Sequence, residues 1–260
     1  IEPVDEICFI IGDFEQVVKD QLVEIAASIG AKCTITRQEE ALGTAHAILC
    51  AGDCLDGNVL VAFADTLFNA NFKLDTEQDS IIWVHQVADP SAFGVVKLGQ
   101  DNAITDFVEK PENFVSDLAI IGIYYFKDGQ NLRNELQDLV DNKVLIGGEY
   151  QLTTALENMK NKGIKFVPGQ VTEWLDCGNK DAVVNTNQRY LEYIKEEKLI
   201  DDSTIMENSI IIEPVFIGAN VKLTNAVVGP HVSIGANSVI ENSIVKNTII
   251  QEESTIVNAN

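Results

Sequence analysis

Two aspartates in this sequence stand where an apolar run ends. Asp65 follows the run 59–64, and Asp176 closes the segment 172–176. In an open α/β sheet, ligands bind just outside the carboxyl ends of the strands. A carboxylate placed there can hold a divalent metal ion and, through it, a phosphate. Taken alone, Asp65 is more simply explained as a turn or helix-cap residue, so its role depends on what the rest of the chain supplies.

The charge balance restricts the partners of this protein. Of its 260 residues, 18 are Lys or Arg and 40 are Asp or Glu, which gives a formal net charge of −22. Because such a surface repels nucleic acids and anionic lipids, we expect no nucleic acid and no membrane as a partner. A phosphate-bearing substrate would need lysine, arginine, backbone N–H groups or a metal ion at the site itself.

The apolar runs and the cysteines point to the cytoplasm. No apolar run approaches the length of a transmembrane helix, and no signal peptide is visible. The odd total of five cysteines argues against a full disulfide set. Reduced thiols in a cytoplasmic protein are the simpler account.

The elements that must position the two aspartates follow an alternating pattern. Strands are expected at 7–11, 33–36 and 59–64, and helices at 15–29 and 44–51, with Thr44 as the N-cap of the second helix. Because the run 59–64 is continuously apolar, we expect a strand that is buried on both faces, as in a parallel sheet. This order of elements is typical of a doubly wound, Rossmann-like α/β fold.

The middle of the chain predicts a second group of strands and three more helices. Gly122 interrupts one of these strands, which often marks a bulge or a close approach of the backbone. The strands are expected at 80–87, 93–98, 103–109, 118–126, 164–167 and 172–176, and the helices at 132–142, 152–162 and 180–198.

The C-terminal part of the sequence is a repeat. From about Ile205, an isoleucine, leucine or valine recurs every five or six residues, and Ile217-Gly-Ala-Asn and Ile234-Gly-Ala-Asn are near copies. This period excludes an α-helix and predicts a parallel β-helix of hexapeptide repeats with about three coils. We therefore expect an α/β domain at 1–200 and a β-helix at 201–260. We also expect a further coil or a partner subunit, in a homo-oligomer, to cover the open coil edges.

Several short motifs resemble, in their order, those of the sugar-1-phosphate nucleotidylyltransferase family, the glucose-1-phosphate thymidylyltransferase and pyrophosphorylase group. The resemblance covers essentially the whole chain, since a left-handed β-helix also follows the catalytic domain in several branches of that family. The motifs are Gln38-x4-Gly43-Thr44-Ala, Ala64-Asp65, Phe93-Gly94-Val-Val, Glu109-Lys110-Pro111, the strand around Gly122, Gly148-Glu149-Tyr150, and Trp174-x-Asp176-x-Gly178.

The resemblance implies a reaction between a nucleoside triphosphate and a sugar 1-phosphate, with dTTP or UTP and glucose 1-phosphate favoured. An oxygen of the sugar phosphate attacks the α-phosphorus, and pyrophosphate leaves. The protein must neutralise charge and hold the reactants in line. By this resemblance, Asp65 and Asp176 hold Mg²⁺, and Lys110 contacts the sugar phosphate.

The same resemblance implies residues for the sugar and for the base. Glu109 would accept hydrogen bonds from sugar hydroxyls, Gly94 and Gly122 would let the backbone approach the sugar, and Trp174 would line the sugar pocket or sit in the core. Gln38 would pair with a pyrimidine edge. Gly43 and Thr44 belong to the same nucleotide-binding loop. Glu149 would either contact the substrate or cap the helix that follows this residue.

One diagnostic segment of that family has no match in these 260 residues. It is a glycine-rich loop of the form Gly-x-Gly-(Thr/Ser)-Arg-Leu-x-Pro, which cradles the triphosphate. In the family it follows a first strand that lies between the strands expected at 7–11 and 59–64. We therefore expect that the 260 residues are not the whole protein and that they do not turn over substrate by themselves.

Three other interpretations remain open. The protein could transfer guanylyl or adenylyl groups, as in the mannose-1-phosphate or glucose-1-phosphate branches. It could be an inactive regulatory or scaffold homologue that binds the same ligands, which the missing loop favours. A hexapeptide β-helix can also carry acyltransferase activity, for which His231 would be the candidate base.

Overall fold

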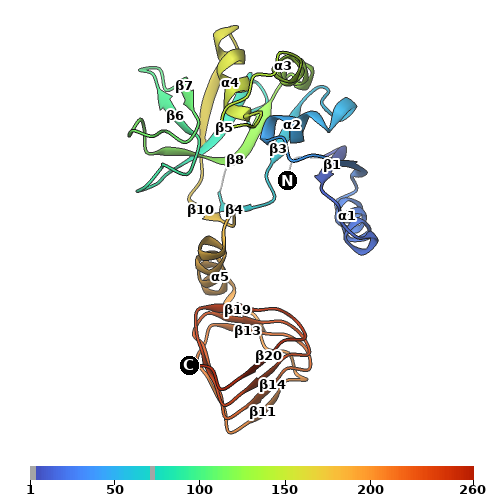
Figure 1. Cartoon of the computed structure of the whole chain (residues 1–260), viewed down its shortest axis with the longest axis vertical. Coiled ribbons are helices and arrows are strands. Elements are labelled where there is room, and N and C mark those ends of the chain that lie inside the picture. The colour runs from blue at the N-terminus through green and yellow to red at the C-terminus, as the bar shows by residue number, and fades with distance from the viewer. Residues whose placement is uncertain (1–3, 71–73) are drawn as a thin grey trace. The chain divides into compact units, whose positions relative to one another are not determined.

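The computed structural model describes residues 4–70 and 74–260. Among these residues no helix is both long and apolar enough to cross a membrane. The helices are α1 (Gln16–Ser28), α2 (Thr44–Leu49), the 3₁₀ turn η1 (Gly52–Cys54), α3 (Gly129–Asp141), α4 (Leu152–Asn161) and α5 (Lys180–Ile194) (Figure 1). The strands before the repeat are β1 (Glu6–Ile11), β2 (Lys32–Arg37), β3 (Val59–Ala62), β4 (Thr66–Asn69), β5 (Ser80–Gln86), β6 (Val95–Leu98), β7 (Ile104–Val108), β8 (Leu118–Phe126), β9 (Phe166–Gln170) and β10 (Glu173–Asp176). Those of the repeat are β11 (Ile205–Glu207), β12 (Ile210–Ile211), β13 (Val215–Ile217), β14 (Lys222–Thr224), β15 (Val227–Val228), β16 (Val232–Ile234), β17 (Val239–Glu241), β18 (Ile244–Val245), β19 (Thr248–Ile250) and β20 (Thr255–Val257).

The chain forms two compact units. The first unit contains the residues up to Phe63 together with Asn69–Glu173, and the second contains Ala64–Phe68 together with Trp174–Asn260. The expected domain boundary between residues 200 and 201 stays a prediction.

Strand β8 is the centre of the sheet in the first unit. It pairs antiparallel with β3, β5 and β6, while β9 extends the sheet in parallel beside β5 and β7 extends it beside β6. Helices α3 and α4 pack against each other, and their buried side chains Leu132, Leu136 and Leu156 join the core formed with Phe126. The fold is thus the expected Rossmann-like α/β fold, built around a mixed sheet.

The strand that precedes Asp65 is less buried than its sequence predicts. In β3, half-buried residues alternate with exposed ones, and Leu60 is 57% exposed. The expectation of a strand buried on both faces is wrong, because among the described strands β3 pairs only with β8 and one of its faces is open. An apolar run alone does not tell an edge strand from a central one.

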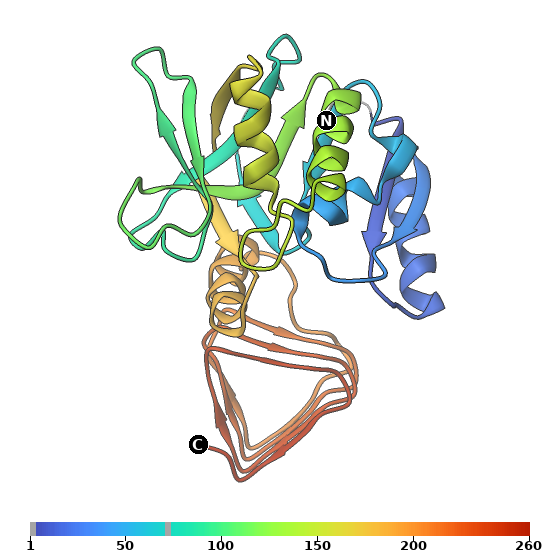
Figure 2. The ribbon, with the colours of Figure 1, turned by 45° about the horizontal axis from the view of Figure 1, so that its top comes forward.

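The first two strands form a small sheet of their own. β1 and β2 pair in parallel in the register Glu6↔Lys32 to Ile11↔Arg37, and α1 connects them and packs on β2 (Figure 2). Within the described residues β1 does not pair with β3. Gly30 ends α1 with a φ of 75°, as its sequence position predicts.

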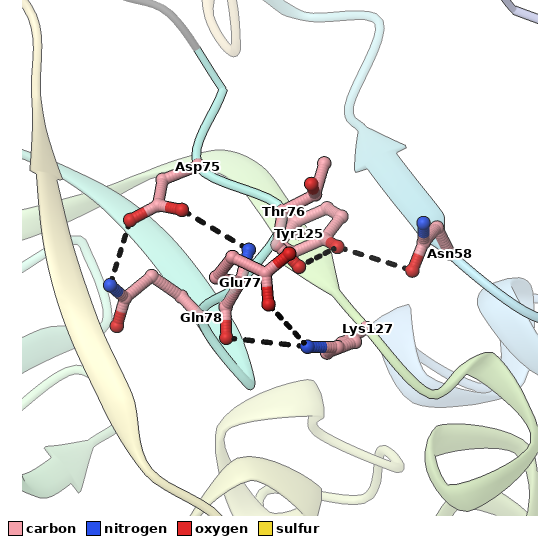
Figure 3. A network of polar contacts seen from close by, with 7 residues as sticks. All are labelled: Asn58, Asp75, Thr76, Glu77, Gln78, Tyr125 and Lys127. Carbon is pink, nitrogen blue, oxygen red and sulfur yellow. Dashed lines mark hydrogen bonds and ion pairs between the residues drawn. The ribbon is translucent and has the colours of Figure 1, made fainter.

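A polar network ties the segment 75–78 to the end of β8. The hydroxyl of the buried Tyr125 lies 3.2 Å from both Asn58 Oδ1 and the carbonyl oxygen of Thr76. Lys127 pairs with Glu77 at 3.4 Å, and Asp75 accepts from the Gln78 side chain and the Glu77 backbone at 2.8 and 3.1 Å (Figure 3). Burial raises the pKa of Tyr125, so its hydroxyl stays protonated and available for hydrogen bonding. The network fixes the C-terminal end of β8 against the segment before β5.

The second unit contains the expected parallel β-helix. Its strands form three sheets, in the orders β11-β14-β17-β20, β12-β15-β18 and β13-β16-β19, and Figure 2 shows the three flat sides of the stacked coils. Inward residues at matching positions, such as Leu223 and Ile240, are fully buried. Asparagines with positive φ turn the corners, and the side chains of Asn208, Asn225 and Asn242 bond to one another at 2.6 and 3.0 Å.

Candidate active site

The two aspartates singled out in the sequence meet in the second unit. Strand β4 starts one residue after Asp65 and pairs with β10, which ends at Asp176. The Cys177 N–H donates to the Asp65 carbonyl oxygen at 2.8 Å. A Cβ atom added to Gly178 would lie 3.2 Å from Asp176 Oδ1 and 3.6 Å from Asp65 Oδ2, so both carboxylates reach the same small volume beside this glycine.

This carboxylate pair fits a divalent cation. Asp176 Oδ1 accepts from the Gly178 N–H at 3.0 Å. Within the part of the chain that the structure describes, no hydrogen bond or ion pair is recorded for Asp176 Oδ2 or for the Asp65 carboxylate. Uncommitted carboxylate oxygens are the ligands Mg²⁺ takes when it keeps several waters and substrate phosphates in its shell. The described residues contain no group of three acidic, histidine or cysteine ligands, so further ligands would come from water or substrate.

The turn that carries Asp176 is held from several sides. Asn179 caps α5 by accepting from the Ala182 N–H at 3.0 Å. Thr186, on the second turn of α5 and only 7% exposed, donates its hydroxyl proton to the Asp176 carbonyl oxygen at 2.6 Å. The backbone at Asp176 is therefore anchored both to Asp65 and to α5.

Trp174 lies two residues before Asp176 on the same strand. Its indole N–H donates to the Thr66 hydroxyl at 3.4 Å, next to Asp65 in the sequence. The ring is half-buried. This contact ties the two strands together, and the sugar-lining role of Trp174 stays a prediction.

A second cluster, in the first unit, contains the residues expected to hold the sugar. The Thr153 hydroxyl donates to Glu109 Oε2 at 2.9 Å. A Cβ atom on Gly94 would lie 3.0 Å from Thr153 Cγ2 and 3.1 Å from Glu109 Oε2, so the glycine makes room for both side chains. Lys110 is exposed, with a φ of 37°, and its backbone N–H donates to the Phe93 carbonyl oxygen at 3.1 Å. The loop thus presents Glu109 and Lys110 from a fixed backbone.

Gly122 bends β8 at its middle. Its φ is 83°, and the pairing of β8 with β5 shifts register between Ile82 and Val84, which confirms the bulge expected from the sequence. The ring of Phe63 fills the space beside the glycine, since a Cβ atom there would lie 3.2 Å from it. The proposed contact of Gly122 with sugar stays a prediction.

The loop expected to bind the base is closed by internal hydrogen bonds. The Gln38 side-chain N–H₂ group lies 3.0 Å from His46 Nδ1 and 3.2 Å from the Gly43 carbonyl oxygen. Its carbonyl oxygen has no recorded partner among the described residues. The ring of His46 stacks on Tyr150, with 6.5 Å between the centroids. Gln38 is thereby held with its acceptor uncommitted.

Gly43 brings this loop against the segment before α4. The Ala45 N–H donates to the Tyr150 carbonyl oxygen at 3.0 Å, and the Tyr150 N–H donates to the Leu42 carbonyl oxygen at 2.8 Å. A Cβ atom on Gly43 would lie 2.6 Å from that Tyr150 oxygen. Only glycine fits between these two backbone segments.

Two expected capping roles are wrong. Gly43, and not Thr44, is the N-cap residue of α2. The Thr44 hydroxyl accepts instead from the Leu152 N–H at 3.1 Å, at the start of α4, where Glu149 was the expected cap. Glu149 is exposed and accepts from the Gln151 side chain. The closure of the loop onto Tyr150 places Thr44 over the first turn of α4, a pairing that local sequence does not reveal.

Comparison with protein families decides the class. The model of a family described as "Nucleotidyl transferase" matches residues 2–193. The chain belongs to this family.

Individual relatives of this nucleotidyl transferase include proteins named as glucose-1-phosphate thymidylyltransferases. It is 28% identical to a glucose-1-phosphate thymidylyltransferase of Streptomyces antibioticus, over 97% of this chain and 76% of that protein. It is 32% identical to a bifunctional protein GlmU of Methanococcus maripaludis, over 81% of this chain and 50% of that protein. The protein is an enzyme of the sugar-phosphate nucleotidyltransferase class.

A solved structure shows the same fold. The nucleoside-diphosphate-sugar pyrophosphorylase of Vibrio cholerae RC9 superposes with a TM-score of 0.59, at 20% sequence identity, over 69% of this chain and 79% of that chain.

The sequence did not assign a role to four residues that hold the candidate site of this nucleotidyl transferase. They are His46, Tyr150, Thr153 and Thr186, which contact Gln38, the Gly43 loop, Glu109 and Asp176 respectively. Tyr150 alone lay in a recognised motif. The others have common residue types, and their partners lie 8 to 44 residues away in the chain, so only folding brings them together.

Proposed function

We propose that this enzyme transfers a nucleotidyl group from dTTP or UTP to a sugar 1-phosphate, with glucose 1-phosphate as the expected acceptor. A phosphate oxygen of the sugar attacks the α-phosphorus of the triphosphate, and pyrophosphate leaves. The family and the names of the relatives support the reaction.

The meeting of Asp65 and Asp176 beside Gly178 is the observation that carries the proposal. These residues would hold Mg²⁺ through oxygens with no recorded partner in the described part of the chain. When bound, the ion neutralises phosphate charge and orients the triphosphate. The chain's own contribution is a carboxylate pair fixed by the β4–β10 pairing and by the turn into α5.

The Glu109 cluster supports the sugar site. Glu109 accepts from Thr153 through Oε2, which leaves Oε1 to accept from a sugar hydroxyl. Lys110 offers a positive charge beside it for the sugar phosphate. Gly94, which has no side chain, leaves room for Thr153 and Glu109 beside its backbone, and we propose that the sugar ring contacts the backbone there. Gly122 and Trp174 are proposed as further contacts of the sugar.

Gln38 supports a choice of base. Its two amide protons face His46 Nδ1 and the Gly43 carbonyl oxygen, so it presents an acceptor to a ligand. Thymine and uracil carry a ring donor at N3–H, and guanine carries one at N1–H, whereas adenine has a ring acceptor at N1 and a donor only at its exocyclic amino group. We therefore propose that Gln38, Gly43 and Thr44 belong to a nucleotide site that prefers a base with a ring N–H over adenine.

The decisive experiment measures pyrophosphate release from dTTP, UTP, GTP or ATP with glucose 1-phosphate and Mg²⁺. It uses the protein as purified from its natural source and, in parallel, the 260-residue chain. Because no segment of the 260 residues matches the triphosphate-binding loop, we expect release only from a protein that contains such a loop. The pyrimidine triphosphates should be the better substrates.

Matched variants identify the site. Asp65→Asn and Asp176→Asn should each lower kcat/KM by more than about a hundredfold, because a metal ligand is lost. Asp181→Asn makes the same change of charge on an exposed residue of α5 and should leave the rate unchanged. Substrate binding without turnover in a protein that contains the triphosphate-binding loop would overturn the proposal and favour an inactive regulatory homologue.

Two further properties are proposed. The five cysteines are free in the structure, which supports a cytoplasmic location. The outward residues Ile210 and Ile244 lie at matching positions of strands β12 and β18, on either side of β15 in one sheet. They are 61% and 53% exposed, which supports assembly of identical chains through the β-helix. Light scattering of the wild type and of an Ile244→Lys variant tests the assembly, since only the wild type should form the oligomer.

A further inference from the structure

Helix α5 joins two parts of the second unit that have different roles in the proposed function. Its second turn touches the carboxylate turn, through the bond from Thr186 to the Asp176 carbonyl oxygen. The next residue touches the β-helix. Asn187 Oδ1 accepts from the Ser233 hydroxyl at 2.6 Å, and Asn187 Nδ2 lies 3.5 Å from the His231 carbonyl oxygen.

A second contact holds the same helix to the same coil. Glu192 Oε1 lies 2.8 Å from His231 Nε2, and the other ring nitrogen of His231 lies 3.3 Å from Asn247 Oδ1 on the next coil. The helix also packs on β16 and β19, the strands that follow these corners. Residues 231–233 therefore hold α5 at two points along its length.

Adjacent residues on a helix point about 100° apart, so Thr186 and Asn187 face different partners. Thr186 is buried and has a short hydrogen bond of 2.6 Å to the Asp176 carbonyl oxygen, whereas Asn187 lies on the side that faces the coil. A helix of 15 residues with a side-chain N-cap is rigid over this distance. A displacement of the coil corner would thus displace the backbone of Asp176.

We propose that Thr186 is a positioning residue for the metal-binding carboxylate of Asp176, and that α5 passes the position of the β-helix corner 231–233 to this carboxylate. The β-helix is then part of the catalytic apparatus, because it sets the direction of a metal ligand. This inference rests on the proposed function in one respect, namely that Asp65 and Asp176 bind a divalent ion.

The test uses Tb³⁺ as a probe that binds oxygen ligands and is excited by a nearby tryptophan. Trp174 lies two residues from Asp176, and its indole contacts Thr66, beside Asp65. Excitation of this indole should sensitise the emission of bound Tb³⁺, and added Mg²⁺ should displace Tb³⁺ and lower that emission. The titration is performed on the 260-residue chain, without substrate. A Trp174→Phe variant removes the local signal and measures the contribution of Tb³⁺ bound elsewhere on the acidic surface.

Three substitutions on α5 address the positioning role. Thr186→Val keeps the shape and removes the hydroxyl, and it should weaken Tb³⁺ binding about tenfold, as changes behind a metal ligand do. Thr186→Ser restores the hydroxyl and should restore affinity. Asn187→Ala should weaken binding several-fold although it touches no residue of the carboxylate turn. Asn185→Ala is the matched control, because Asn185 is exposed and has no recorded bond to a described residue.

The outcomes distinguish a failure of the proposed metal site from a failure of the positioning role of Thr186 and α5. If Asp65→Asn and Asp176→Asn leave Tb³⁺ binding unchanged, the metal site itself is wrong. If they abolish binding while Thr186→Val binds as the wild type does, the positioning role of Thr186 is refuted. If Asn187→Ala behaves as Asn185→Ala does, the link to the β-helix is refuted. Circular dichroism melts show that each variant is folded at the temperature of the titration.

Discussion

Replacing Gly43 by alanine should both destabilise the first unit and weaken nucleotide binding. The residue has φ 107° and ψ 175°, a region of backbone conformation that is essentially restricted to glycine. The added Cβ atom would lie 2.6 Å from the carbonyl oxygen and 2.8 Å from the nitrogen of Tyr150. Both atoms take part in backbone hydrogen bonds: the Tyr150 oxygen accepts from the Ala45 N–H, and the Tyr150 N–H donates to the Leu42 carbonyl oxygen. Neither atom can move away without weakening its bond.

The two effects have separate magnitudes. Holding a residue other than glycine in this conformation costs about 1–3 kcal/mol. Separating the two backbone segments removes two hydrogen bonds, each with a net value of about 1 kcal/mol. The free energy of unfolding should therefore fall by roughly 3–5 kcal/mol. The Gln38 amide, which is held by the Gly43 carbonyl oxygen, should lose its orientation at the same time.

The assay is urea unfolding followed by the fluorescence of Trp83, which is 2% exposed in the first unit. A Trp174→Phe background removes the other tryptophan. Two glycines serve as controls. Gly163 has a φ of 101° but open space around its Cβ position, so Gly163→Ala should cost only the backbone strain, about 1–2 kcal/mol. Gly12 has open space and no positive φ, so Gly12→Ala should be neutral or stabilising by up to about 1 kcal/mol.

The comparison can refute the reasoning. If Gly43→Ala lowers the free energy of unfolding by no more than Gly163→Ala does, Tyr150 and its hydrogen-bond partners move aside without loss. A variant that is destabilised but binds dTTP or UTP as tightly as the wild type would mean that the loop does not position Gln38 for the base.

Three further predictions concern ionisable groups away from the metal site. Lys162→Met should lower the urea concentration at the midpoint of unfolding at pH 7, because the carboxylate of Glu135, whose side chain is 3% exposed and lies 2.5 Å from Lys162 Nζ, loses its ion pair. Burial, followed by the neighbouring Cys54, raises the pKa of Cys8 to about 11, so iodoacetamide at pH 8 should label Cys8 far more slowly in the folded chain than in urea, as read by mass spectrometry. A hydrogen bond from His231 lowers the pKa of Glu192 from 4.5, so acidification through the lowered value should remove stability from the wild type but not from Glu192→Gln, as thermal melts between pH 3 and 6 would show.

Each of these predictions has a control or a contrary result. Lys165→Met breaks an exposed pair with Asp101 at 4.0 Å and should change stability by less than about 0.5 kcal/mol. Equal labelling of Cys8 in folded and unfolded chains would show that the thiol is accessible. The direction of the pH effect follows from the lowered pKa of Glu192, because folding favours the ionised carboxylate. Its contribution to the free energy of unfolding is therefore fully present above pH 4.5 and is lost as the pH falls and the carboxylate is protonated. The same pH profile for the wild type and Glu192→Gln would contradict it.

The order of elements was predictable because each one has its own local pattern. Three local patterns each specify an element over a short stretch of sequence. They are the apolar stripe of α1 with the glycine at its end, the continuous apolar run of β8, and the five- to six-residue period of the β-helix. The exposure of β3 was not predictable in the same way. It depends on which strands lie beside Val59–Ala62, and that is a property of the sheet.

The candidate site also has features that the sequence predicts and features that only the tertiary structure shows. By itself the sequence determined the family resemblance, the two aspartates at the ends of apolar runs, and the Glu109 and Gln38 motifs, because these depend on residue type and spacing along the chain. The tertiary structure alone decided that Asp65 and Asp176 converge at Gly178, that Thr44 contacts the start of α4, and that Thr186 and Asn187 tie the carboxylate turn to the β-helix. The physical reason is the separation of the partners along the chain. A hydrogen bond between residues 10 to 108 positions apart produces no periodic pattern in the sequence, and it forms only when packing has already fixed both backbones.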